Sequence, residues 1–360
     1  MERILVYGMT ANMGGIETYL LNLYDRLHGK KVMIDFLSDF PKIIEENKIK
    51  SEGSRVFHIP AKSKGLFSHW KALFTIFKEH TEYKTVYFNI LDAGAVLTCV
   101  IPFFMKRKII IHSHNNETDK TKLHRMCKPI LNLITYARVA CSEEASYYMF
   151  GRRGMKSLVI PNAIDAKKYT YNPNTQIKKR AELKLGDKLT ICHVGRLSRQ
   201  KNPFFLIDIM EKLQAIEPNV VLLSIGTGEL EEQFHQYIHD KNMDNIVMCL
   251  GMRQDIPDLL QASDIFLFPS LYEGFGIALV EAQAAGLPCI ISDVIPDSAV
   301  ILKEIVKKIG LNDSLEIWID SILKFKNNEK RDTYDCICKA GFDISCIEEY
   351  DKKLLEYFVG

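Results

Sequence analysis

The sequence predicts an α/β protein made of two doubly wound, parallel-sheet domains in tandem. Short apolar runs alternate with amphipathic stretches along almost the whole chain. The apolar runs lack the polar alternation of half-exposed strands, which is typical of parallel strands buried on both faces. The length of 360 residues suits two domains, and the alternation pauses once, near Pro161.

The first half begins with a strand over 3–8, a glycine-containing loop and a helix over 16–28. Further strands are expected at 32–37, 55–59, 85–89, 108–112, 138–141 and 158–160. Helices between these strands are expected near 66–80, 92–105, 119–135 and 143–150. Pro161 stops the last strand, and the stretch 172–174 that follows is polar and turn-rich. We therefore expect an N-terminal domain over 1–163.

The alternation then restarts in a C-terminal domain expected over 164–343. Its strands are expected at 189–194, 220–224, 246–250, 264–268 and 288–292. Its helices are expected at 203–214, 229–240, 255–261 and 277–285, with helices filling much of the rest. A last helix is expected over about 344–358. Doubly wound sheets bind ligands at the carboxyl ends of their strands, so two such domains facing one another imply a cleft.

The composition of the chain argues against a secreted or membrane-spanning protein. The nine cysteines are odd in number and form no C-x-x-C pair, which indicates free thiols in a reducing cytoplasm. The first residues do not resemble a signal peptide, and the longest apolar run, 93–105, is too short for a membrane-spanning helix.

The charged residues are unevenly distributed along the chain. Residues 1–165 hold 24 Lys and Arg against 16 Asp and Glu, and the remainder holds 23 against 29. This split fits either ordinary surface scatter or a front half facing phosphate or an anionic membrane.

Two loops resemble anion sites. Gly14 and Gly15 follow the first strand and open a helix, where free backbone N–H groups favour an anion. A tight turn is the plain alternative, and the spacing from Gly8 is not that of a dinucleotide fingerprint. Arg196 and Lys201 flank the loop between a strand and the helix at 203. Two cations at a helix start are unfavourably placed unless an anion such as a diphosphate binds there.

The third loop gives the sharpest signal. A buried strand at 265–268 runs into a loop with two glycines and then a helix. Glu273 in this loop and Glu281 in the helix are eight residues apart, so both carboxylates can face one pocket. Backbone amides of the 274–276 turn can donate to the same pocket. An acid early in a helix is unremarkable alone, and the pair with its glycines is what indicates a site.

At these residues the sequence resembles the retaining glycosyltransferases of family 4, which have the GT-B fold of two Rossmann-like domains facing across a cleft. Glu273 and Glu281 match the Glu-x7-Glu motif, and Arg196 with Lys201 matches a second motif. Gly14-Gly15-Ile16-Glu17 is similar to the amino-terminal glycine motif, and segments 109–115, 140–143 and 160–165 also match. The similarity runs from about residue 3 to 290, and the capsular and exopolysaccharide enzymes are the most similar subgroup.

The resemblance implies a role for each matching residue. Glu281 would accept hydrogen bonds from the nucleotide ribose, while Arg196 and Lys201 would hold the donor diphosphate. Glu273 would contact the transferred sugar. The backbone amides that share this task lie in the turn of Gly274, Phe275, Gly276 and Ile277.

Three further matches are implied more loosely. Gly15 would approach the diphosphate or acceptor, and Gly251 with Met252 would contact the nucleobase. His114 would lie by the sugar, with His112 as the competing choice, because residues two apart on a strand share a face. Either histidine could instead be buried by packing alone. The C-terminal segment 344–360 would pack back on the N-terminal domain in this fold.

The chemistry agrees with this assignment. Cleavage of a sugar–diphosphate bond leaves negative charge on the diphosphate, which fixed cations stabilise electrostatically. No Asp-x-Asp follows a strand, so no metal or other cofactor is expected and Arg196 with Lys201 would replace it. The implied partners are a nucleotide-sugar donor, by default a UDP-sugar, and a lipid-linked saccharide acceptor, but no nucleic acid. The basic cluster 106–108 is either a contact with an anionic membrane or a solvated turn.

Two other functions remain as alternatives. A GT-B nucleotide-sugar 2-epimerase shares the fold and the diphosphate site, but the Glu-x7-Glu context disfavours it. A nicotinamide-dependent dehydrogenase would need fingerprint glycines that are missing, although Asp35 and Asp39 lie near the distance of a ribose-binding acid. One departure concerns 289–296, where many family members carry a glycine pair that this sequence lacks.

Overall fold

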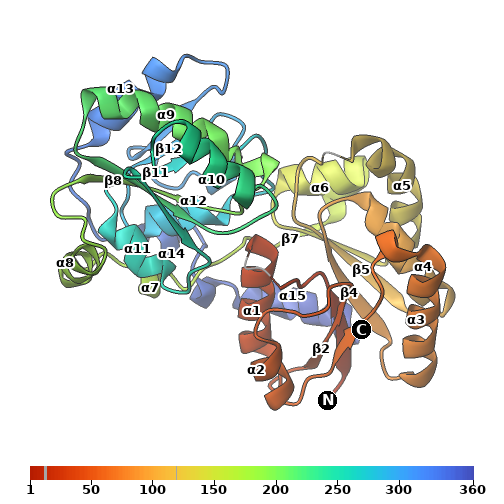
Figure 1. Ribbon diagram of the computed structural model, residues 1–360. Helices are drawn as coiled ribbons and strands as arrows, with labels where there is room; N and C mark the ends of the chain where they lie inside the picture. The colour runs from red at the N-terminus through yellow and green to blue at the C-terminus, as the bar shows by residue number, and fades with distance from the viewer. Residues whose placement is uncertain (12–13, 119) are drawn as a thin grey trace. The chain divides into compact units, whose positions relative to one another are not determined.

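The computed structural model describes residues 1–11, 14–118 and 120–360. The chain divides into two compact units, one formed by Met1–Asn162 with Ile347–Gly360 and the other by Ala163–Cys346. Each unit is a doubly wound α/β domain whose sheet is parallel throughout, with helices on both faces (Figure 1). This confirms the fold class predicted from the alternation of apolar runs and amphipathic stretches.

The sheet of the first unit has seven strands in the order β3-β2-β1-β4-β5-β6-β7. Its strands are β1 (Arg3–Tyr7), β2 (Met33–Ser38), β3 (Val56–His58), β4 (Thr85–Ile90), β5 (Lys108–Ser113), β6 (Ala137–Ala140) and β7 (Leu158–Val159). The central strand β4 is buried along its whole length, because helices cover both of its faces. The strand order reverses between β1 and β4, which is where such sheets bind ligands.

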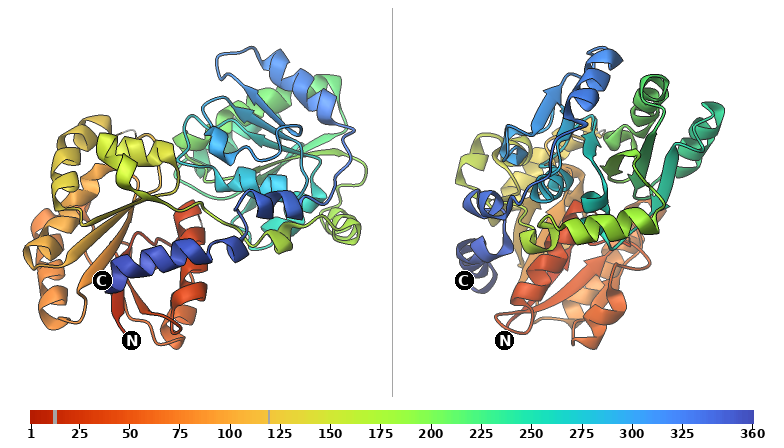
Figure 2. Two further views of the ribbon diagram at one scale, coloured as in Figure 1. Left: turned by 180° about the vertical axis from the view of Figure 1, so that it is seen from behind. Right: turned by 90° about the vertical axis from the view of Figure 1, so that its left-hand side faces the viewer.

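Two layers of helices cover this sheet. The helices of the unit are α1 (Gly15–Leu27), α2 (Glu46–Ser51), α3 (Leu66–Glu79), α4 (Val96–Phe104), α5 (Thr121–Ile134), α6 (Glu143–Phe150) and α15 (Glu348–Val359). Side chains of α3, α4, α5 and α6 share one apolar core with the sheet, so these four helices cover the same face. Figure 2 shows α1 and α15 on the opposite face. Arg26 on α1 pairs with Asp351 on α15 at 2.8 Å, and Thr85 Oγ1 donates to the Phe358 carbonyl.

The second unit repeats the plan with six strands in the order β10-β9-β8-β11-β12-β13. The strands are β8 (Leu189–Val194), β9 (Val220–Ile225), β10 (Val247–Gly251), β11 (Ile265–Phe268), β12 (Cys289–Ser292) and β13 (Val306–Ile309). Helices α9 (Pro203–Ile216), α10 (Glu231–Asp240) and α13 (Leu315–Phe325) share one core with the sheet. The remaining helices are α7 (Ala166–Tyr169), α8 (Pro173–Glu182), α11 (Ile256–Ala262), α12 (Ile277–Ala284) and α14 (Tyr334–Lys339).

Several elements differ from the sequence-based expectation, among them the short helix α2, which was not predicted, and two with a clear physical reason. The stretch 172–174 was expected to be a turn, but it starts α8: the Asn172 side chain accepts from the Asn174 N–H and Pro173 occupies the first helical position. Asparagine and proline are as typical of helix starts as of turns, so composition alone could not separate the two. Strand β13 was missed because it is a short edge strand with Lys307 and Lys308 at its centre.

Candidate functional site

The candidate site of the second unit lies where the order of its sheet reverses. Strands β8 and β11 are neighbours there, and their helices leave on opposite faces of the sheet. The loop after β8 carries Arg196 and Lys201, and the loop after β11 carries Glu273. Three side chains that the sequence singled out therefore come from the two strand ends that flank a ligand-binding position of this fold class.

Hydrogen bonds fasten these two loops together. The Leu271 N–H donates to the Gln200 carbonyl at 2.8 Å, and the Gln200 amide donates back to the Tyr272 carbonyl at 3.0 Å. Asn202, which adopts a left-handed conformation ahead of α9, donates to the Pro269 carbonyl at 3.3 Å. One backbone hydrogen bond and two side-chain amide hydrogen bonds to backbone carbonyls thus hold the two loops together and support their charged side chains.

The two cationic side chains of the site, Lys201 and Arg196, differ in how firmly neighbouring groups hold them. Lys201 Nζ lies 2.5 Å from Glu273 Oε1, and both side chains are largely buried. The same ammonium lies 4.5 Å from the ring centroid of Phe268. Arg196, in contrast, is exposed. One cation is therefore fixed by a carboxylate and an aromatic ring, while the guanidinium of the other meets solvent at the same strand end.

The turn between Glu273 and helix α12 is shaped by a left-handed glycine. Gly276 has a φ of 93° and precedes Ile277, the first residue of the helix, so any other residue would strain this helix start. Gly274 lies in the preceding loop, and the Phe275 ring stacks on Phe342 at a centroid distance of 5.3 Å. The first N–H groups of a helix have no partner within the helix, so this turn offers donors to a ligand.

Glu281 is buried within α12, four residues after the helix begins. Tyr169 Oη, from α7, donates to Glu281 Oε1 at 2.7 Å. Burial raises the pKa of the Glu281 carboxyl to about 7, and the hydrogen bond from Tyr169 opposes this rise. The carboxyl is therefore a group whose charge changes near neutral pH. Tyr169 could not be identified from the sequence, because no local pattern links residues 112 positions apart.

Two further glycines missed by the sequence analysis bind the loops after β8 and β9 together. A Cβ on Gly226, whose φ is 131°, would lie 2.1 Å from the Gly195 carbonyl oxygen. A Cβ on Gly228 would lie 2.3 Å from the Leu197 carbonyl oxygen. The backbones can approach this closely only without side chains. Two glycines with one residue between them, directly after a buried strand, were the signal that could have identified them.

The remaining matches in this unit lie at the end of β10. Gly251 closes that strand with a φ of 62°, and its carbonyl accepts from the Gly226 N–H at 2.8 Å. Met252 follows with about half of its surface exposed. The structure thus brings Gly251 beside Gly226, whose loop packs against the residue before Arg196; Gly251 and Arg196 are 55 positions apart in sequence.

The first unit carries the amino-terminal glycine motif at its own switch point. Gly15 is the first residue of α1, which follows β1 after a short loop. Glu17 in the first turn accepts hydrogen bonds from the backbone N–H and the hydroxyl of Thr10, at 3.1 and 2.6 Å. The acid of this motif therefore ties the loop to the helix. At the end of β1, a Cβ on Gly8 would lie 2.4 Å from the Asn89 carbonyl oxygen.

His112 and His114 lie on one face, as predicted, with ring centroids 3.9 Å apart. His112 is fully buried, and its Nδ1 lies 2.5 Å from the hydroxyl of Tyr87. His114 follows the end of β5 and retains slight exposure. Burial lowers the pKa of the His114 imidazole to about 3 and that of His112 well below its usual value. Both rings are therefore neutral at physiological pH.

The hydrogen bonds of His114 fix its tautomer. The Asn89 amide N–H donates to the Tyr7 carbonyl, so its oxygen faces His114 Nε2 at 2.9 Å and accepts the proton of that nitrogen. Neutral His114 then carries a lone pair on Nδ1, which is buried and has no partner among the described residues. An unsatisfied buried acceptor indicates a place for a ligand hydroxyl or a water.

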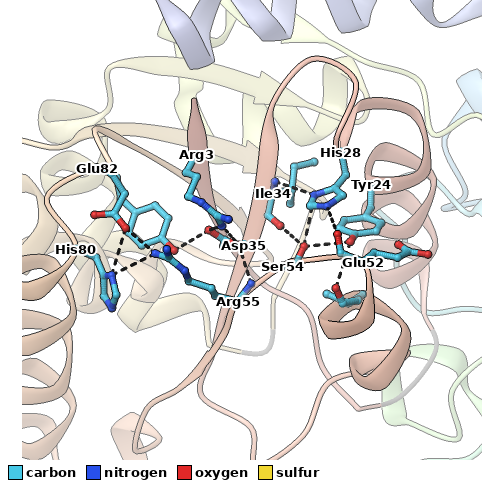
Figure 3. A network of polar contacts seen from close by, with 12 residues as sticks. Arg3, Tyr24, His28, Ile34, Asp35, Glu52, Ser54, Arg55, His80 and Glu82 are labelled. Carbon is cyan, nitrogen blue, oxygen red and sulfur yellow. Dashed lines mark hydrogen bonds and ion pairs between the residues drawn. The ribbon is translucent and has the colours of Figure 1, made fainter. Parts of the chain in front are cut away.

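Asp35, one of the two acids near the ribose distance, is occupied elsewhere. Figure 3 shows it beside Arg3 and Arg55, away from the carboxyl ends of the strands. It accepts from the Arg3 guanidinium at 2.6 Å, from the Arg55 backbone N–H and from the Tyr83 hydroxyl, both at 2.7 Å. Asp39 does follow a strand end, and it pairs with Lys62 at 3.4 Å. Asp35 therefore fastens β1, β2 and the start of β4 instead of a ribose.

The described part of the chain contains neither a metal-binding cluster nor a membrane-spanning helix. Within residues 1–11, 14–118 and 120–360, no group of three or more His, Cys, Asp or Glu side chains is arranged to hold a metal ion. Over the same ranges, no helix combines the length and apolar character needed to cross a bilayer. All nine cysteines are free thiols, and five of them are buried.

The chain is similar to known glycosyltransferases in both sequence and fold. Residues 174–334 match the family model of glycosyl transferases group 1. The putative glycosyltransferase EpsF of Bacillus subtilis is 30% identical over 353 residues, covering 90% of this chain and 87% of the relative. An Escherichia coli relative, UDP-Gal:alpha-D-GlcNAc-diphosphoundecaprenol alpha-1,3-galactosyltransferase, is 32% identical over 207 residues, which cover 55% of this chain and 53% of the relative.

A solved structure shows the same fold over the whole length. Anabaena Alr3699/HepE, in complex with UDP-glucose, aligns with a TM-score of 0.80 over 99% of this chain and 100% of that chain, at 21% identity. The two parallel-sheet domains are thus those of the GT-B fold. The full-length similarity to EpsF and the family match in the second unit lead to one conclusion: the chain belongs to the group 1 glycosyltransferases.

Proposed function

We propose that this glycosyltransferase moves a sugar, with retention of configuration, from a nucleotide-diphosphate donor to a lipid-linked saccharide. A UDP-sugar is the proposed donor, and the pathway is the biosynthesis of a capsular, exo- or lipopolysaccharide. One observation supports the donor assignment: the Lys201–Glu273 pair joins the loops after β8 and β11 where the sheet order reverses, and Arg196 and a helix start lie in the same two loops. Two cations and oriented amides suit a diphosphate.

The names of two similar proteins support the finer parts of the proposal. The Escherichia coli relative is named for a UDP-galactose donor and a diphosphoundecaprenol-linked acceptor. HepE was solved with UDP-glucose. We propose the same two ligand classes for this chain: a UDP-sugar bound by the C-terminal domain and a lipid-linked saccharide bound by the N-terminal domain. A cytoplasmic location, at the inner face of the membrane, belongs to the same proposal and fits nine free thiols.

The family resemblance gives each site residue a proposed task, and the surroundings of the residue are compatible with that task. Glu281, when ionised, accepts hydrogen bonds from the ribose hydroxyls. Arg196 turns from solvent onto the diphosphate, and Lys201 donates to it while keeping one proton on Glu273. An ammonium has three protons to donate, so the lysine can serve both partners. Because the leaving diphosphate gains negative charge as the bond breaks, both cations lower the barrier to that step without a metal ion.

The sugar and nucleobase contacts complete the proposal. Glu273 and the amides of Gly274, Phe275, Gly276 and Ile277 would hold the sugar hydroxyls. Met252 and the backbone of Gly251 would flank the base. From the N-terminal domain, His114 would accept a hydrogen bond from a sugar hydroxyl through its free Nδ1 lone pair, and Gly15 would offer backbone N–H.

Donor binding and product analysis test the proposal together. Nucleotide sugars are screened for a rise in melting temperature, since a ligand that binds the native state stabilises it by mass action. We expect UDP-sugars to stabilise the protein, and the stabilising donor to glycosylate a lipid-diphosphate-linked saccharide in the presence of a chelator. The anomeric configuration of the product is read by NMR. Conversion of the donor without acceptor to an epimer, or an absolute need for a divalent ion, would overturn the proposal.

A further inference from the structure

Helix α5 of the N-terminal domain is apolar on two sides. Its inner side contributes Cys127, Leu131 and Ile134 to the core beneath the helix layer. Four more large apolar side chains point outward, with exposed fractions of 40, 75, 52 and 78%: Leu123, Met126, Ile130 and Leu133. Their spacing of three, four and three residues aligns them along one side of the helix. A surface helix of a soluble domain ordinarily carries polar residues on that side.

The outward stripe of α5 is part of a larger apolar surface. Figure 1 shows α3, α4 and α5 side by side on one face of the sheet, and these helices contact one another through α4. Phe67 and Phe74 on α3 and Phe103 and Phe104 at the end of α4 are also exposed. Within the described part of the chain, twelve of the twenty exposed large apolar side chains lie between residues 61 and 160, whereas the whole second unit has five.

Basic side chains are concentrated in the same helices and connecting segments. Residues 61–160 contain 16 Lys and Arg against 7 Asp and Glu. Helix α5 itself carries Lys122, Arg125 and Lys128 and no acid. The cluster Lys106-Arg107-Lys108 follows the exposed end of α4 directly. The 3-10 segment η3 (Gly151–Lys156) adds Arg152, Arg153 and Lys156 around the exposed side chain of Met155.

Several of these cations have no acidic partner among the described residues. Lys106, Lys122, Arg125, Arg152, Arg153 and Lys156 form no ion pair with the residues that the structure describes. Uncompensated cations repel one another, and this repulsion is relieved when an anionic surface approaches. A second copy of the chain would bring the same cations against their own kind, so charge disfavours self-association through this face.

We propose that this surface, the docking face, rests on an anionic lipid bilayer. We define it by the outer side of α5, the end of α4 and η3. Helix α5 lies in the plane of the interface, with Leu123, Met126, Ile130 and Leu133 below the headgroups and the surrounding cations against lipid phosphates. Two weak signals, an inserted apolar side and a basic rim, together give stable but reversible attachment. The inference deepens the proposed function, because it assigns the surface that would bring this chain to a lipid-linked acceptor.

Vesicle co-sedimentation of the full-length protein tests the docking face. The probes are vesicles of phosphatidylcholine alone and vesicles in which phosphatidylglycerol replaces part of it. We expect affinity for the anionic vesicles on the order of tenfold or more above that for the neutral ones, falling steeply with added salt. Equal binding to both kinds of vesicle, or binding to neither, would overturn the proposal.

Two pairs of surface variants separate the two signals. Met126→Ser with Leu133→Ser removes the most exposed part of the stripe and should weaken binding to both kinds of vesicle by about tenfold or more. Lys122→Gln with Arg125→Gln should abolish most of the preference for anionic lipid and its salt dependence. The matched controls lie in the C-terminal domain: Ile177→Ser with Ile216→Ser, and Lys178→Gln with Lys307→Gln, all at exposed positions. Binding that drops equally in the controls would contradict the assignment.

Membrane binding through the docking face and the proposed sugar transfer are tested by separate measurements. Vesicle binding is measured without donor or acceptor, so it stands or falls independently of sugar transfer. Circular dichroism and melting curves establish that each variant folds, and the exposed positions chosen favour this outcome. Sedimentation velocity measures oligomeric state: if the serine variants dissociate an oligomer and leave vesicle binding unchanged, the face is a protein interface and the proposal is wrong.

Discussion

Tyr169 Oη donates a hydrogen bond to Glu281 Oε1 over 2.7 Å inside the C-terminal domain. The tyrosine comes from a four-residue helix that follows the domain boundary, and the glutamate from the helix after the glycine turn. One carboxylate oxygen is thereby fixed, while burial favours the neutral form of the group. The pair sets both the orientation of Glu281 and the pH at which it becomes an anion.

Stability should depend on pH through Glu281. Because burial raises the pKa of this carboxyl from 4.5 to about 7, the folded protein holds a proton that the unfolded chain has lost between these pH values. The contribution of this group to stability therefore falls as pH rises from 4.5 to 7 and is constant above. We expect Glu281→Gln to be more stable than wild type at pH 8, by up to about 3 kcal/mol, and equal to it at pH 4. Urea denaturation at both pH values measures this, and equal stability at pH 8 would contradict it.

Donor affinity should show the opposite dependence on pH. Only the ionised carboxylate offers two acceptors to ribose hydroxyls, so the affinity for UDP rises through pH 7 in wild type and is low and flat in Glu281→Gln. Tyr169→Phe removes a hydrogen bond that lowers the pKa of Glu281, so the midpoint of this rise should move to higher pH. Isothermal titration calorimetry across pH 6–9 measures the midpoint. An unchanged midpoint in Tyr169→Phe would show that the pair does not tune the site.

Substitution of either cation should lower turnover, but only the substitution of Lys201 should also lower the stability of the fold. Arg196 is exposed, so Arg196→Ala should change stability by less than about 0.5 kcal/mol. Turnover should nevertheless fall by about 10²–10³, the usual loss for one electrostatic contact in a transition state. Lys201→Ala should cost similar turnover and also destabilise the fold by about 3 kcal/mol, because it leaves the buried Glu273 carboxylate without its partner. Steady-state kinetics and urea denaturation are measured for both.

Lys212→Ala is the control for removal of a charge. Lys212 lies on α9 and pairs with Glu316 at the surface, away from the strand ends. We expect both its turnover and its stability to match those of wild type. If Arg196→Ala turns over as fast as this control, then the assignment of the diphosphate site is wrong.

Gly226 should be irreplaceable by alanine for steric reasons. The added Cβ would meet the Gly195 carbonyl oxygen at 2.1 Å, so the loops after β8 and β9 would have to separate. We expect Gly226→Ala to lose several kcal/mol of stability or to fail to fold. The control is Gly186→Ala, which also has a positive φ but open space around the new Cβ, and should cost only about 1 kcal/mol. Equal costs at the two positions would mean that backbone strain alone, not loop contact, explains Gly226.

Replacement of Asp35 should lower the stability of the protein and leave its affinity for the donor unchanged. Asp35→Ala leaves the Tyr83 hydroxyl and the Arg55 N–H without their buried acceptor, which should destabilise the protein by about 3 kcal/mol. UDP affinity per folded molecule should stay that of wild type. NAD should not bind either protein, since Asp35 is already occupied. Binding of NAD by wild type, lost in the variant, would support the dehydrogenase interpretation instead.

Much of the fold could be predicted because it follows from local pattern. Apolar runs such as the fully buried β4 and β9 identify parallel strands, and the glycine turn before Ile277 identifies a helix start. Both signals are contained in a few neighbouring residues. The start of α8 was mistaken for a turn because Asn172 and Pro173 serve both structures. The edge strand β13 was missed because its lysines break the apolar pattern.

The candidate site was predicted as a set of residues but not as a set of contacts. The sequence singled out Lys201 and Glu273 separately, and only the folded loops bring their charges to 2.5 Å. It left His112 and His114 as alternatives; each ring has one buried nitrogen without a partner among the described residues, and the two differ in that only His114 retains slight exposure. It did not find Gly226, whose importance depends on a carbonyl 31 positions earlier in the chain.

By itself the amino-acid order determined the class of fold, the two-domain plan and the residues at the strand ends, since strands, helices and turns arise from periodicity within short windows. Tertiary structure alone decided which charges pair, which acid has a pKa near neutrality and which apolar side chains of α5 remain outside. Those properties depend on desolvation and on distances between segments far apart in the chain. No local pattern encodes them, because burial belongs to the packed molecule and not to the residue.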